Sequence, residues 1–566
     1  MAANPRAAAV AALVRQEQDG FSNLVLDAEL RRQKLEGRDK AFAGAVFYTV
    51  LEHQGTLDFI LEQFLPKGLA RLDPQVREIL RAALAQARYM QVPVSAAVNE
   101  AVKLTRTFKK ASASGLVNAV LRKACNYDLE TARFRNETQR LMVLGSAGQD
   151  VAEFLRTHYP EEALGILTHT ADGGCTSLRA NCLKMDAAAL CEKLLESGVK
   201  SAQPGLVPGS VLAKFEGSPA EHPLFKEGCF HVEGQASQLA ALCVEAKPGD
   251  TVIDLCAAPG GKTLLLAEEM QGQGALYSCD VAEHRVGLIR SAVQRMGFAH
   301  VTALCNDATR PNPKLPAADR ILVDAPCSGL GILAKKPDIR YKTLEKARHD
   351  ELLATQSAIL DTAAALLKAG GRLVYSTCTI DPAENEEQVA ADIQRAEELA
   401  DFTIVCPHWG TEYRLTSDAS QEKWTKIFAE NGADLILGTH PHVIEPIEWV
   451  TDEASEHEML VYYSLGNFVN WTSGTGEGVA NRMVGGMAEV TITKNNHGEV
   501  EIADYGVKPM ISHVASGPEG VTTYFLEDYP EELAEENEIV SQDPEFSREY
   551  CVNLCDSIWG DLWKAE

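Results

Sequence analysis

Three short segments of the sequence carry side chains that can do chemistry. The first, Asp254–Lys262 (DLCAAPGGK), closes an apolar strand with a glycine-rich turn. The other two hold cysteines: Cys327 lies in Asp324–Gly329 (DAPCSG), and Cys378 lies in Tyr375–Thr379 (YSTCT). A glycine-rich turn after a strand makes a cofactor cradle, because its backbone N–H groups point at a carboxylate or phosphate. Cysteines just past further strands place two thiols on the same edge of a sheet.

The elements that must position these segments are apolar strands alternating with helices from Asp250 onward, which predict a doubly wound parallel sheet. The expected strands are Thr251–Leu255, Ala275–Cys279, Val301–Leu304, Arg320–Val323 and Arg372–Tyr375. Asp280 ends the second strand, where an acidic group can bind ribose hydroxyls, and Asp307 after the third strand could face an exocyclic amine. Lys262 lacks the upstream glycine of a phosphate loop, so S-adenosylmethionine is favoured over a nucleoside triphosphate.

The two cysteines favour covalent catalysis on a pyrimidine. Carbon-5 of a pyrimidine is too weak a nucleophile to attack a methyl sulfonium, but a thiolate that adds at carbon-6 makes it enamine-like. A base must then remove the carbon-5 proton so that the thiol can leave. The alternative is that both are buried structural cysteines, which is common for any single cysteine. Asp324 and Ser376-Thr377 beside them, at strand-to-loop junctions, weigh against that alternative.

These segments resemble RNA (cytosine-5) methyltransferases, and the helical N-terminal part is similar to the NusB-like domain of the RsmB (Sun/Fmu) family, which modifies 16S ribosomal RNA. The N-terminal resemblance rests on Leu72–Arg77, Val92–Val102 and Val117–Arg122, and the whole resemblance covers residues 1 to about 390. One departure is Val232–Gln238, which stands where the family has Gln-Asp-x-Ala-Ser. This departure is expected to loosen the N-terminal contact to the cofactor domain.

The resemblance implies a role for each site residue. Cys378 is the expected nucleophile, Cys327 assists product release, and Asp324 hydrogen-bonds the cytosine. The residues expected to hold S-adenosylmethionine are Cys256, Ala257, Ala258, Pro259, Gly260, Gly261, Lys262, Asp280, Arg285, Asp307 and Asp324. DNA cytosine methyltransferases use a Pro-Cys cysteine as nucleophile, so a second cysteine favours the RNA class. The expected partner is ribosomal RNA with an unstacked cytosine; no obligate protein partner and no membrane partner is inferred.

Charge and cysteine usage agree with an RNA-binding protein of the cytoplasm. The net charge is −27, yet residues 1–125 hold 18 Lys+Arg against 12 Asp+Glu, while residues 401–566 hold 8 against 31. A basic head suits a polyanion, although ordinary surface variation explains it equally well. The 14 cysteines include no Cys-x-x-Cys pair with zinc spacing, which fits free thiols in a reducing compartment. The N-terminus shows no signal peptide, and no apolar run is long enough to span a membrane.

The predicted architecture is multidomain. Apolar residues at three-to-four spacing predict an all-α head, with helices at Ala7–Ala12, Arg38–Leu51, Val76–Met90, Ala96–Thr107 and Gly115–Lys123. The expected domains are a NusB-like RNA-binding head (1–128), an α+β subdomain (129–245), a Rossmann-like methyltransferase domain (246–392), a β-rich fragment (393–526) and an acidic, helix-prone or disordered tail (527–566).

The sequence after residue 392 no longer follows the methyltransferase pattern. A final strand with a Gly-Phe-Phe-like signature is expected and not found. Instead, Ala400–Tyr413, Gly432–His442 and Tyr463–Phe468 resemble the C-terminal part of CapA/PgsA poly-γ-glutamate capsule proteins, which are similar to metallophosphatases. His408, His440 and His442 match metal-binding histidines of that family.

No N-terminal half of a phosphatase precedes this fragment, so satisfied histidines are favoured over ligands and no metal site is assigned. We therefore expect a chimera joined near residues 389–398, with a partial metallophosphatase-like tail and an unpaired edge on the methyltransferase sheet. The alternatives to an active methyltransferase are an RNA-binding module whose catalytic core is crippled by the tail and, less favoured, a metallophosphatase or capsule-synthesis-related protein.

Overall fold

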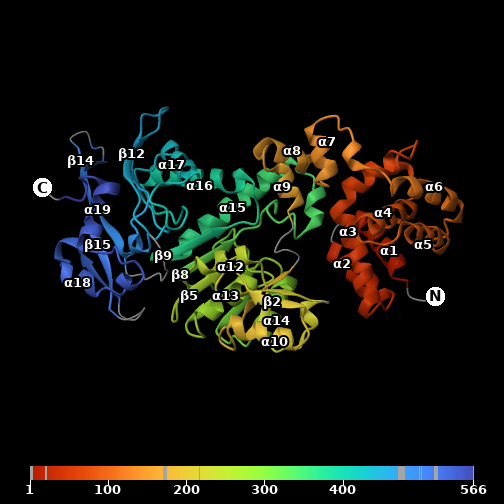
Figure 1. Ribbon diagram of the computed structural model, residues 1–566, viewed down its shortest axis with the longest axis horizontal. Coiled ribbons are helices and arrows are strands. Elements are labelled where there is room, and N and C mark those ends of the chain that lie inside the picture. Colours follow the sequence, from red (N-terminus) through yellow and green to blue (C-terminus); the bar gives the residue numbers. More distant parts are fainter. Residues whose placement is uncertain are drawn as a thin grey trace. The chain divides into compact units, whose positions relative to one another are not determined.

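The computed structural model describes residues 4–564 except 20–21, 170–174, 216, 469–477, 496–497, 499 and 516–520. The chain divides into two compact units, Met1–Glu384 and Asn385–Glu566. Figure 1 shows the elements of both units along the chain. The expected boundary at residue 392 falls inside helix α16 (Glu386–Leu399). The observed division therefore lies earlier, directly after the loop that carries Cys378.

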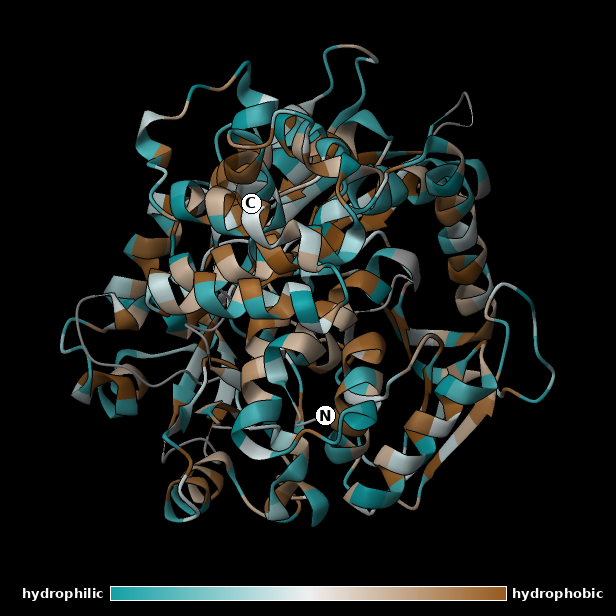
Figure 2. Cartoon of the chain, turned by 90° about the vertical axis from the view of Figure 1, so that its right-hand side faces the viewer, coloured by the Kyte–Doolittle hydropathy of each residue, from teal (hydrophilic) through white to brown (hydrophobic). Residues whose placement is uncertain are grey.

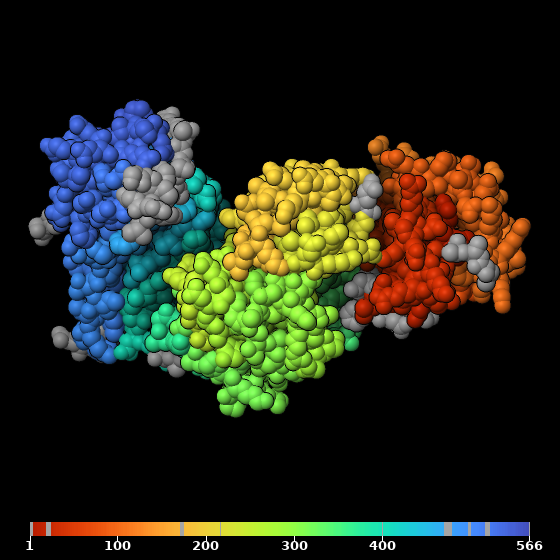
Figure 3. All heavy atoms as spheres, turned by 90° about the horizontal axis from the view of Figure 1, so that it is seen from below, coloured from red at the N-terminus to blue at the C-terminus, as the bar shows by residue number. Residues whose placement is uncertain are grey.

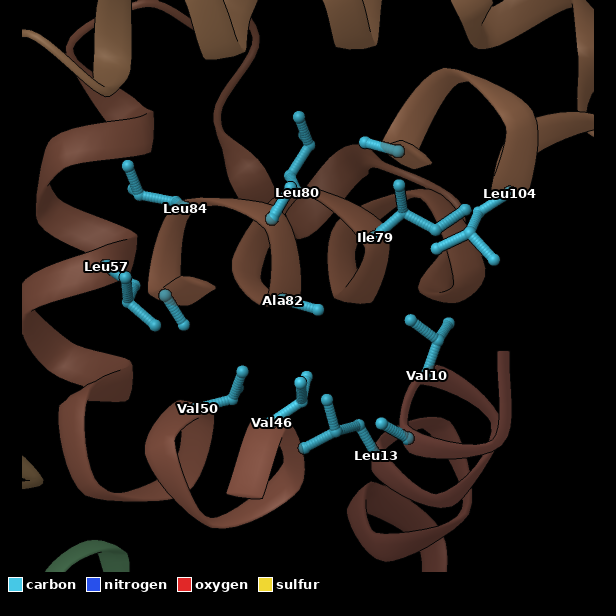
Figure 4. Packing of buried hydrophobic residues seen from close by; sticks show 14 of the residues in the cluster. Val10, Leu13, Val46, Val50, Leu57, Ile79, Leu80, Ala82, Leu84 and Leu104 are labelled. Atoms are coloured by element: carbon cyan, nitrogen blue, oxygen red, sulfur yellow. The ribbon is translucent and has the colours of Figure 1, made fainter. Parts of the chain in front are cut away.

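Helices form the head of the first unit. They are α1 (Pro5–Asp19), α2 (Ser22–Arg32), α3 (Gly37–Glu62), α4 (Pro74–Tyr89), α5 (Val94–Thr107) and α6 (Ser114–Ala124). Hydrophobic and hydrophilic residues share these helices (Figure 2), and the helices pack into a continuous body, red and orange in Figure 3. Val10, Leu13, Val46, Val50 and Ile79 are at most 2% exposed and point into one interior (Figure 4). The predicted helical bundle is confirmed.

Local sequence and tertiary packing both decide where the head's helices end. The side chain of Asp73 caps α4, at the predicted start of that helix. Helix α3 is longer than predicted: it passes Leu51 and a non-helical residue, His53, before it ends at Glu62. The ring of His53 stacks on that of Tyr89 in α4, with centroids 3.7 Å apart. The part of α3 that extends beyond its predicted end at Leu51 therefore packs against α4.

Short helices and an antiparallel sheet follow the head. The helices are α7 (Glu137–Leu144), α8 (Gln149–His158), α9 (Ala163–Thr168), α10 (Ala187–Glu196), α11 (Pro223–Lys226) and α12 (Gln235–Leu242). The strands β1 (Thr176–Ala180), β2 (Ser201–Pro204), β3 (Ser210–Lys214) and β4 (Phe230–Val232) pair in the order β2-β3-β1-β4. The predicted mixture of helices and strands in this region is confirmed.

The first unit ends in the predicted parallel sheet. Its strands are β5 (Thr251–Asp254), β6 (Ala275–Asp280), β7 (Val301–Cys305), β8 (Ala318–Asp324) and β9 (Leu367–Ser376), in the order β7-β6-β5-β8-β9. Helices α13 (Gly261–Glu269), α14 (Glu283–Met296) and α15 (Lys346–Leu366) cover it. Val252 packs with Leu264 of α13, whereas its neighbour Ile253 packs with Ile359 of α15. Successive residues therefore face opposite layers, as in a doubly wound sheet.

Strand β9 forms one edge of this sheet. Among the described residues it pairs with β8, and its residues are half-buried or exposed. The edge of the methyltransferase sheet that was expected to lack a neighbouring strand is therefore the edge formed by β9.

The second unit is β-rich. One sheet has the order β10-β11-β13-β12 and a second the order β14-β15-β16. The strands are β10 (Ile404–Val405), β11 (Leu435–Leu437), β12 (Ile447–Thr451), β13 (Glu458–Tyr462), β14 (Val484–Lys494), β15 (Val500–Val514) and β16 (Val521–Phe525). The helices after α16 are α17 (Ala419–Glu430), α18 (Glu531–Glu536) and α19 (Arg548–Trp559). Strands β14 and β15 pair antiparallel, and residues 496–497 and 499 between them lie outside the described residues.

The acidic C-terminal segment is folded. Cys555 and Trp559 of α19 are buried in the same apolar cluster as Val507 and Ile511 of β15. The helices after Glu527 thus share the core of the second sheet, and the alternative of a disordered tail is wrong. No helix in the described part of the chain has the length and apolar composition needed to cross a membrane.

Candidate active site

The loops that follow β5, β6, β8 and β9 meet at one edge, because the carboxyl ends of parallel strands share an edge of their sheet. The turn after β5 reaches α13 through Gly260, which has φ +108°, a backbone conformation that suits glycine. A Cβ on Gly261 would lie 2.9 Å from Oε1 of Glu233, so a larger residue would clash there. The turn Cys256–Lys262 therefore presents the positive amino end of α13 with little side-chain bulk around it.

Asp280 and Arg285, two of the residues predicted to hold the cofactor, lie beside this turn and contact each other. Asp280 ends β6, is 3% exposed, and accepts the Ala282 N–H at 3.1 Å. Nη1 of Arg285 lies 3.4 Å from its other oxygen, and Nη2 donates to the Ala258 carbonyl at 3.1 Å. Arg285 thus links the carboxylate after β6 to the glycine-rich turn after β5.

Asp307 is more exposed than Asp280. Its Oδ1 accepts hydrogen bonds from the N–H and hydroxyl of Thr309, at 3.0 and 2.6 Å. These bonds lower the pKa of Asp307, so the group stays a carboxylate at the end of β7. The structure leaves it half-exposed beside the edge that carries the turn.

Asp324 lies between the turn and the thiols. Its Oδ2 is 2.7 Å from Nζ of Lys262, and its Oδ1 accepts the Ser376 hydroxyl at 3.0 Å. Lys262 lies in the first turn of α13 and Ser376 ends β9, so Asp324, which ends β8, joins that helix to the neighbouring strand end. The fully buried Asp254 differs: burial raises its pKa to about 7, and Thr263 donates to it at 2.6 Å.

The two predicted cysteines are in contact. Their Sγ atoms are 3.1 Å apart, and the backbone N–H of Cys378 points at Sγ of Cys327, 3.3 Å away. The hydrogen bond from Cys327 is the main cause that lowers the pKa of Cys378 to about 7, helped by the charges of Lys336 and Lys262. The same bond, together with burial, raises the pKa of Cys327. In this pair Cys378 is the more easily ionised thiol and Cys327 the less easily ionised one.

The neighbouring Cys256 differs from Cys378 in the direction of its pKa shift. Cys256 belongs to the glycine-rich turn, yet burial and three neighbouring carboxylates raise its pKa to about 12. Its sulfur therefore stays protonated, and the backbone is the part of Cys256 suited to a cofactor. The nucleophile assignment thus rests on the environment and not on the residue type alone.

Sequence analysis missed a buried carboxylate behind the thiols. Glu384 is 0% exposed and accepts the Ser328 N–H at 2.9 and 3.2 Å. Gln356 of α15 also donates to it, at 2.8 Å. A charged residue within a proline-containing stretch just after Cys378 was the available signal for Glu384. Gln356 lies within a helix and has no local signal.

The second unit gathers a different set of side chains. Ligand atoms of Glu412, His440 and His442 all lie within 4.8 Å of one another. Nδ1 of His442 is 2.9 Å from Oδ1 of Asn467. The ring of His408 packs on that of His440, with centroids 4.6 Å apart. Of the three histidines singled out in the sequence, two thus converge in the structure, and the third member of their cluster is a glutamate.

Comparisons with known proteins cover most of the chain. The family described as 16S rRNA methyltransferase RsmB/F matches residues 241–420, and the NusB family matches residues 3–126. A probable ribosomal RNA small subunit methyltransferase B from Synechocystis sp. is 33% identical over 392 residues, which are 67% of this chain and 86% of that relative. Its counterpart in Bacillus subtilis is 32% identical over 394 residues, 68% and 87% of the two chains. The crystal structure of PH0851 aligns with a TM-score of 0.58 and 27% identity over 70% of this chain and 90% of that one.

The comparisons bear on the predicted extent of the family resemblance. The family match reaches residue 420, whereas the curated relatives match 67–69% of the chain. These matches give no support to the predicted CapA-like resemblance of residues 393–526 or to a fusion near residues 389–398.

Proposed function

The chain belongs to the RsmB family of ribosomal RNA small subunit methyltransferases, and we propose that it transfers a methyl group from S-adenosylmethionine to carbon-5 of a cytosine in 16S ribosomal RNA. The observation that carries the proposal is the pair of thiols 3.1 Å apart whose pKa values are shifted in opposite directions. A thiolate beside a proton-donating thiol is suited to covalent addition to a pyrimidine and to release from it.

The turn after β5 fits S-adenosylmethionine by the chemistry of its donors. The amino end of α13 suits the cofactor's carboxylate, and the buried Asp280 suits its ribose hydroxyls. When bound, the cofactor supplies an electrophilic methyl group. The residues proposed to hold it are Cys256, Ala257, Ala258, Pro259, Gly260, Gly261, Lys262, Asp280, Arg285, Asp307 and Asp324.

Cys378 and its neighbours carry the steps at the cytosine. The Cys378 thiolate forms a bond to carbon-6, and the displaced electron pair makes carbon-5 nucleophilic toward the methyl group. A base then takes the carbon-5 proton, the electrons return to the ring, and the carbon–sulfur bond breaks. Cys327 stabilises the departing thiolate through the contact that joins the two sulfurs. Asp324, fixed by Lys262 and Ser376, orients the cytosine.

The head is the proposed RNA-binding part of the enzyme. Residues 3–126 match the NusB family, and residues 1–125 carry an excess of Lys+Arg, 18 against 12 Asp+Glu. A basic surface gains affinity for phosphates through counterion release. The cytosine must leave its stack to meet Cys378, which favours a loop or junction of the RNA.

Methyl transfer by the full chain to protein-free 16S ribosomal RNA tests the proposal. Incorporation of labelled methyl at carbon-5 of a cytosine, absent in Cys378→Ala, is the expected result. Binding of the same RNA without transfer would instead favour the alternative of an RNA-binding module with a crippled core, for which the exposed β9 edge is the structural argument.

A second function is favoured by one observation in the second unit. We propose residues 393–526 as a CapA-like module in which Glu412, His440 and His442 are the remnant of a metal site. Two histidines and a carboxylate are ligands suited to zinc. Zinc-dependent or manganese-dependent hydrolysis of p-nitrophenyl phosphate that disappears in His440→Ala would support a metallophosphatase. Absence of hydrolysis leaves the methyltransferase as the activity of the chain.

A further inference from the structure

One buried carboxylate joins the two loops that carry the thiols. Glu384 ends the short 3-10 helix Pro382–Glu384 in the loop after β9, on the same loop as Cys378. Its oxygens lie 2.9 and 3.2 Å from the backbone nitrogen of Ser328, the residue next to Cys327. The loop after β9 thus holds the loop after β8 directly behind the assisting thiol.

Further bonds brace this connection on both sides of Cys327. The side-chain amide of Gln356 donates to Glu384 at 2.8 Å and to the Pro326 carbonyl at 2.9 Å. The hydroxyls of Ser328 and Thr379 are 2.6 Å apart. Gln356 and Glu384 are both 0% exposed, so water does not compete for these bonds.

Strand pairing ends before it reaches the thiols. The β8–β9 register finishes with Asp324 opposite Ser376. Beyond it, one backbone bond from the Gly331 N–H to the Cys378 carbonyl, 3.0 Å long, also joins the loops. Next to Cys327, Glu384 and Gln356 bond the backbone on either side of it, in addition to the Ser328–Thr379 contact and the Cys378 N–H that points at its sulfur. Bonds to a carboxylate are shorter and stronger than neutral ones, which suits a contact that must be held to a fraction of an ångström.

We propose that Glu384 is a positioning residue that keeps Cys327 within hydrogen-bonding distance of Cys378, acting through the Ser328 N–H and braced by Gln356. This role deepens the proposed methyl transfer and rests on it. Glu384 is not a catalytic residue, because it acts on the sulfurs through Ser328.

The electrostatics of Cys378 make this role measurable. The hydrogen bond from Cys327 is the largest cause that lowers the pKa of Cys378, while burial and the Asp324 charge raise it. If Cys327 moves away, the raising causes remain and the thiolate becomes scarcer at neutral pH. A purely structural Glu384 would change folding stability without moving the titration of Cys378.

The test measures alkylation of Cys378 by iodoacetamide between pH 6 and pH 10 in the full chain, without RNA or cofactor, by mass spectrometry of its peptide. Glu384→Gln keeps the size of the side chain but replaces one acceptor oxygen by a donor group. We expect the alkylation midpoint to rise by about one pH unit or more, so that labelling at pH 7 falls about fivefold or more. Glu351→Gln, the same change at an exposed position of α15, should match the unmodified chain.

A second variant covers the case in which Glu384→Gln does not fold. Gln356→Leu removes the bonds that brace Glu384 and the Pro326 carbonyl and leaves the Glu384 carboxylate in place, so a smaller rise in the same direction is expected. An unchanged midpoint in the variant that folds overturns the proposal, even where methyl transfer falls. If instead the midpoints shift but the unmodified chain methylates no RNA, the proposed function fails and the thiol geometry stands.

Discussion

Both units place reactive side chains on loops that follow parallel strands, yet the two groups are built differently. In the first unit each group contacts a partner directly: the sulfur of Cys378 lies 3.1 Å from that of Cys327, and Oδ2 of Asp324 lies 2.7 Å from Nζ of Lys262. In the second unit Glu412, His440 and His442 converge within 4.8 Å, but Glu412 is exposed and the histidines are half-exposed.

The difference shows that bringing polar side chains together is distinct from shifting the pKa of one of them. Parallel topology alone brings the ends of several strands together, which is enough to cluster polar side chains in both units. A thiol becomes a nucleophile only when its surroundings favour the thiolate, and in the first unit the hydrogen bond from Cys327 and the charges of Lys336 and Lys262 act in that direction on Cys378. The predictions below either weaken those partners or remove a residue of the second cluster.

The largest effect is expected from Cys378→Ser. The hydroxyl of serine has a far higher pKa than a thiol and cannot add to carbon-6 at neutral pH, so methyl transfer should fall by about a thousandfold or more. Labelled-methyl incorporation into 16S ribosomal RNA measures this, with the thermal unfolding midpoint as the check on folding. Substantial remaining transfer by a folded variant would remove Cys378 from the mechanism.

Cys327→Ala should separate bond formation from release. The adduct between Cys378 and the cytosine still forms, but the departing thiolate loses its hydrogen-bond donor, so protein and RNA stay joined. We expect a band of protein–RNA adduct on a denaturing gel and a fall in turnover of about a hundredfold. A variant that turns over slowly without any adduct would show that the two thiols do not divide the work in this way.

The parallel sheet could be predicted from the sequence, whereas the contacts around the two thiols could not. Asp280 and Asp324 were placed correctly because strands follow a local apolar pattern, and each carboxylate ends one of them. Glu384 was missed because its meaning depends on Ser328, which is close in space but distant in the chain.

The second unit shows the same limit of local patterns. His408 was grouped with His440 and His442 by resemblance, whereas the fold brings Glu412 to the two other histidines and packs the His408 ring at an angle against that of His440. The path of the loop between β10 and α17 decides this, and no periodicity in the sequence encodes it.

The pH dependence should report the lowered pKa of Cys378. Because this pKa is about 7 in the folded protein, the thiolate fraction rises about tenfold per pH unit well below pH 7 and levels off above it. The rate of adduct formation in a single-turnover experiment should follow this curve. A rate that keeps rising up to pH 9 would mean that Cys327 does not act on Cys378 in solution.

Arg285→Ala should weaken the cofactor site moderately. The change removes the partner of the buried Asp280 and the bond to the Ala258 carbonyl, but Arg285 is half-exposed and water replaces part of what is lost. We expect the KM for S-adenosylmethionine to rise about five- to tenfold with little change in kcat. Arg290→Ala on the same helix, whose partner Glu283 is exposed, is the matched control. Equal effects of the two variants would assign Arg285 to the surface and not to the cofactor turn.

The smallest effect on methyl transfer is expected from His440→Ala. This variant tests whether the cluster of Glu412, His440 and His442 matters to methyl transfer. His440 lies in the second unit among half-exposed and exposed side chains, whereas the hydrogen bonds described above for the thiols and the glycine-rich turn are made by residues of the first unit. We expect methyl transfer within about twofold of the unmodified chain and an unfolding midpoint that changes little, as for other surface substitutions. A large fall in transfer at an unchanged unfolding midpoint would contradict this contrast, because it would show that the second cluster serves the reaction at Cys378.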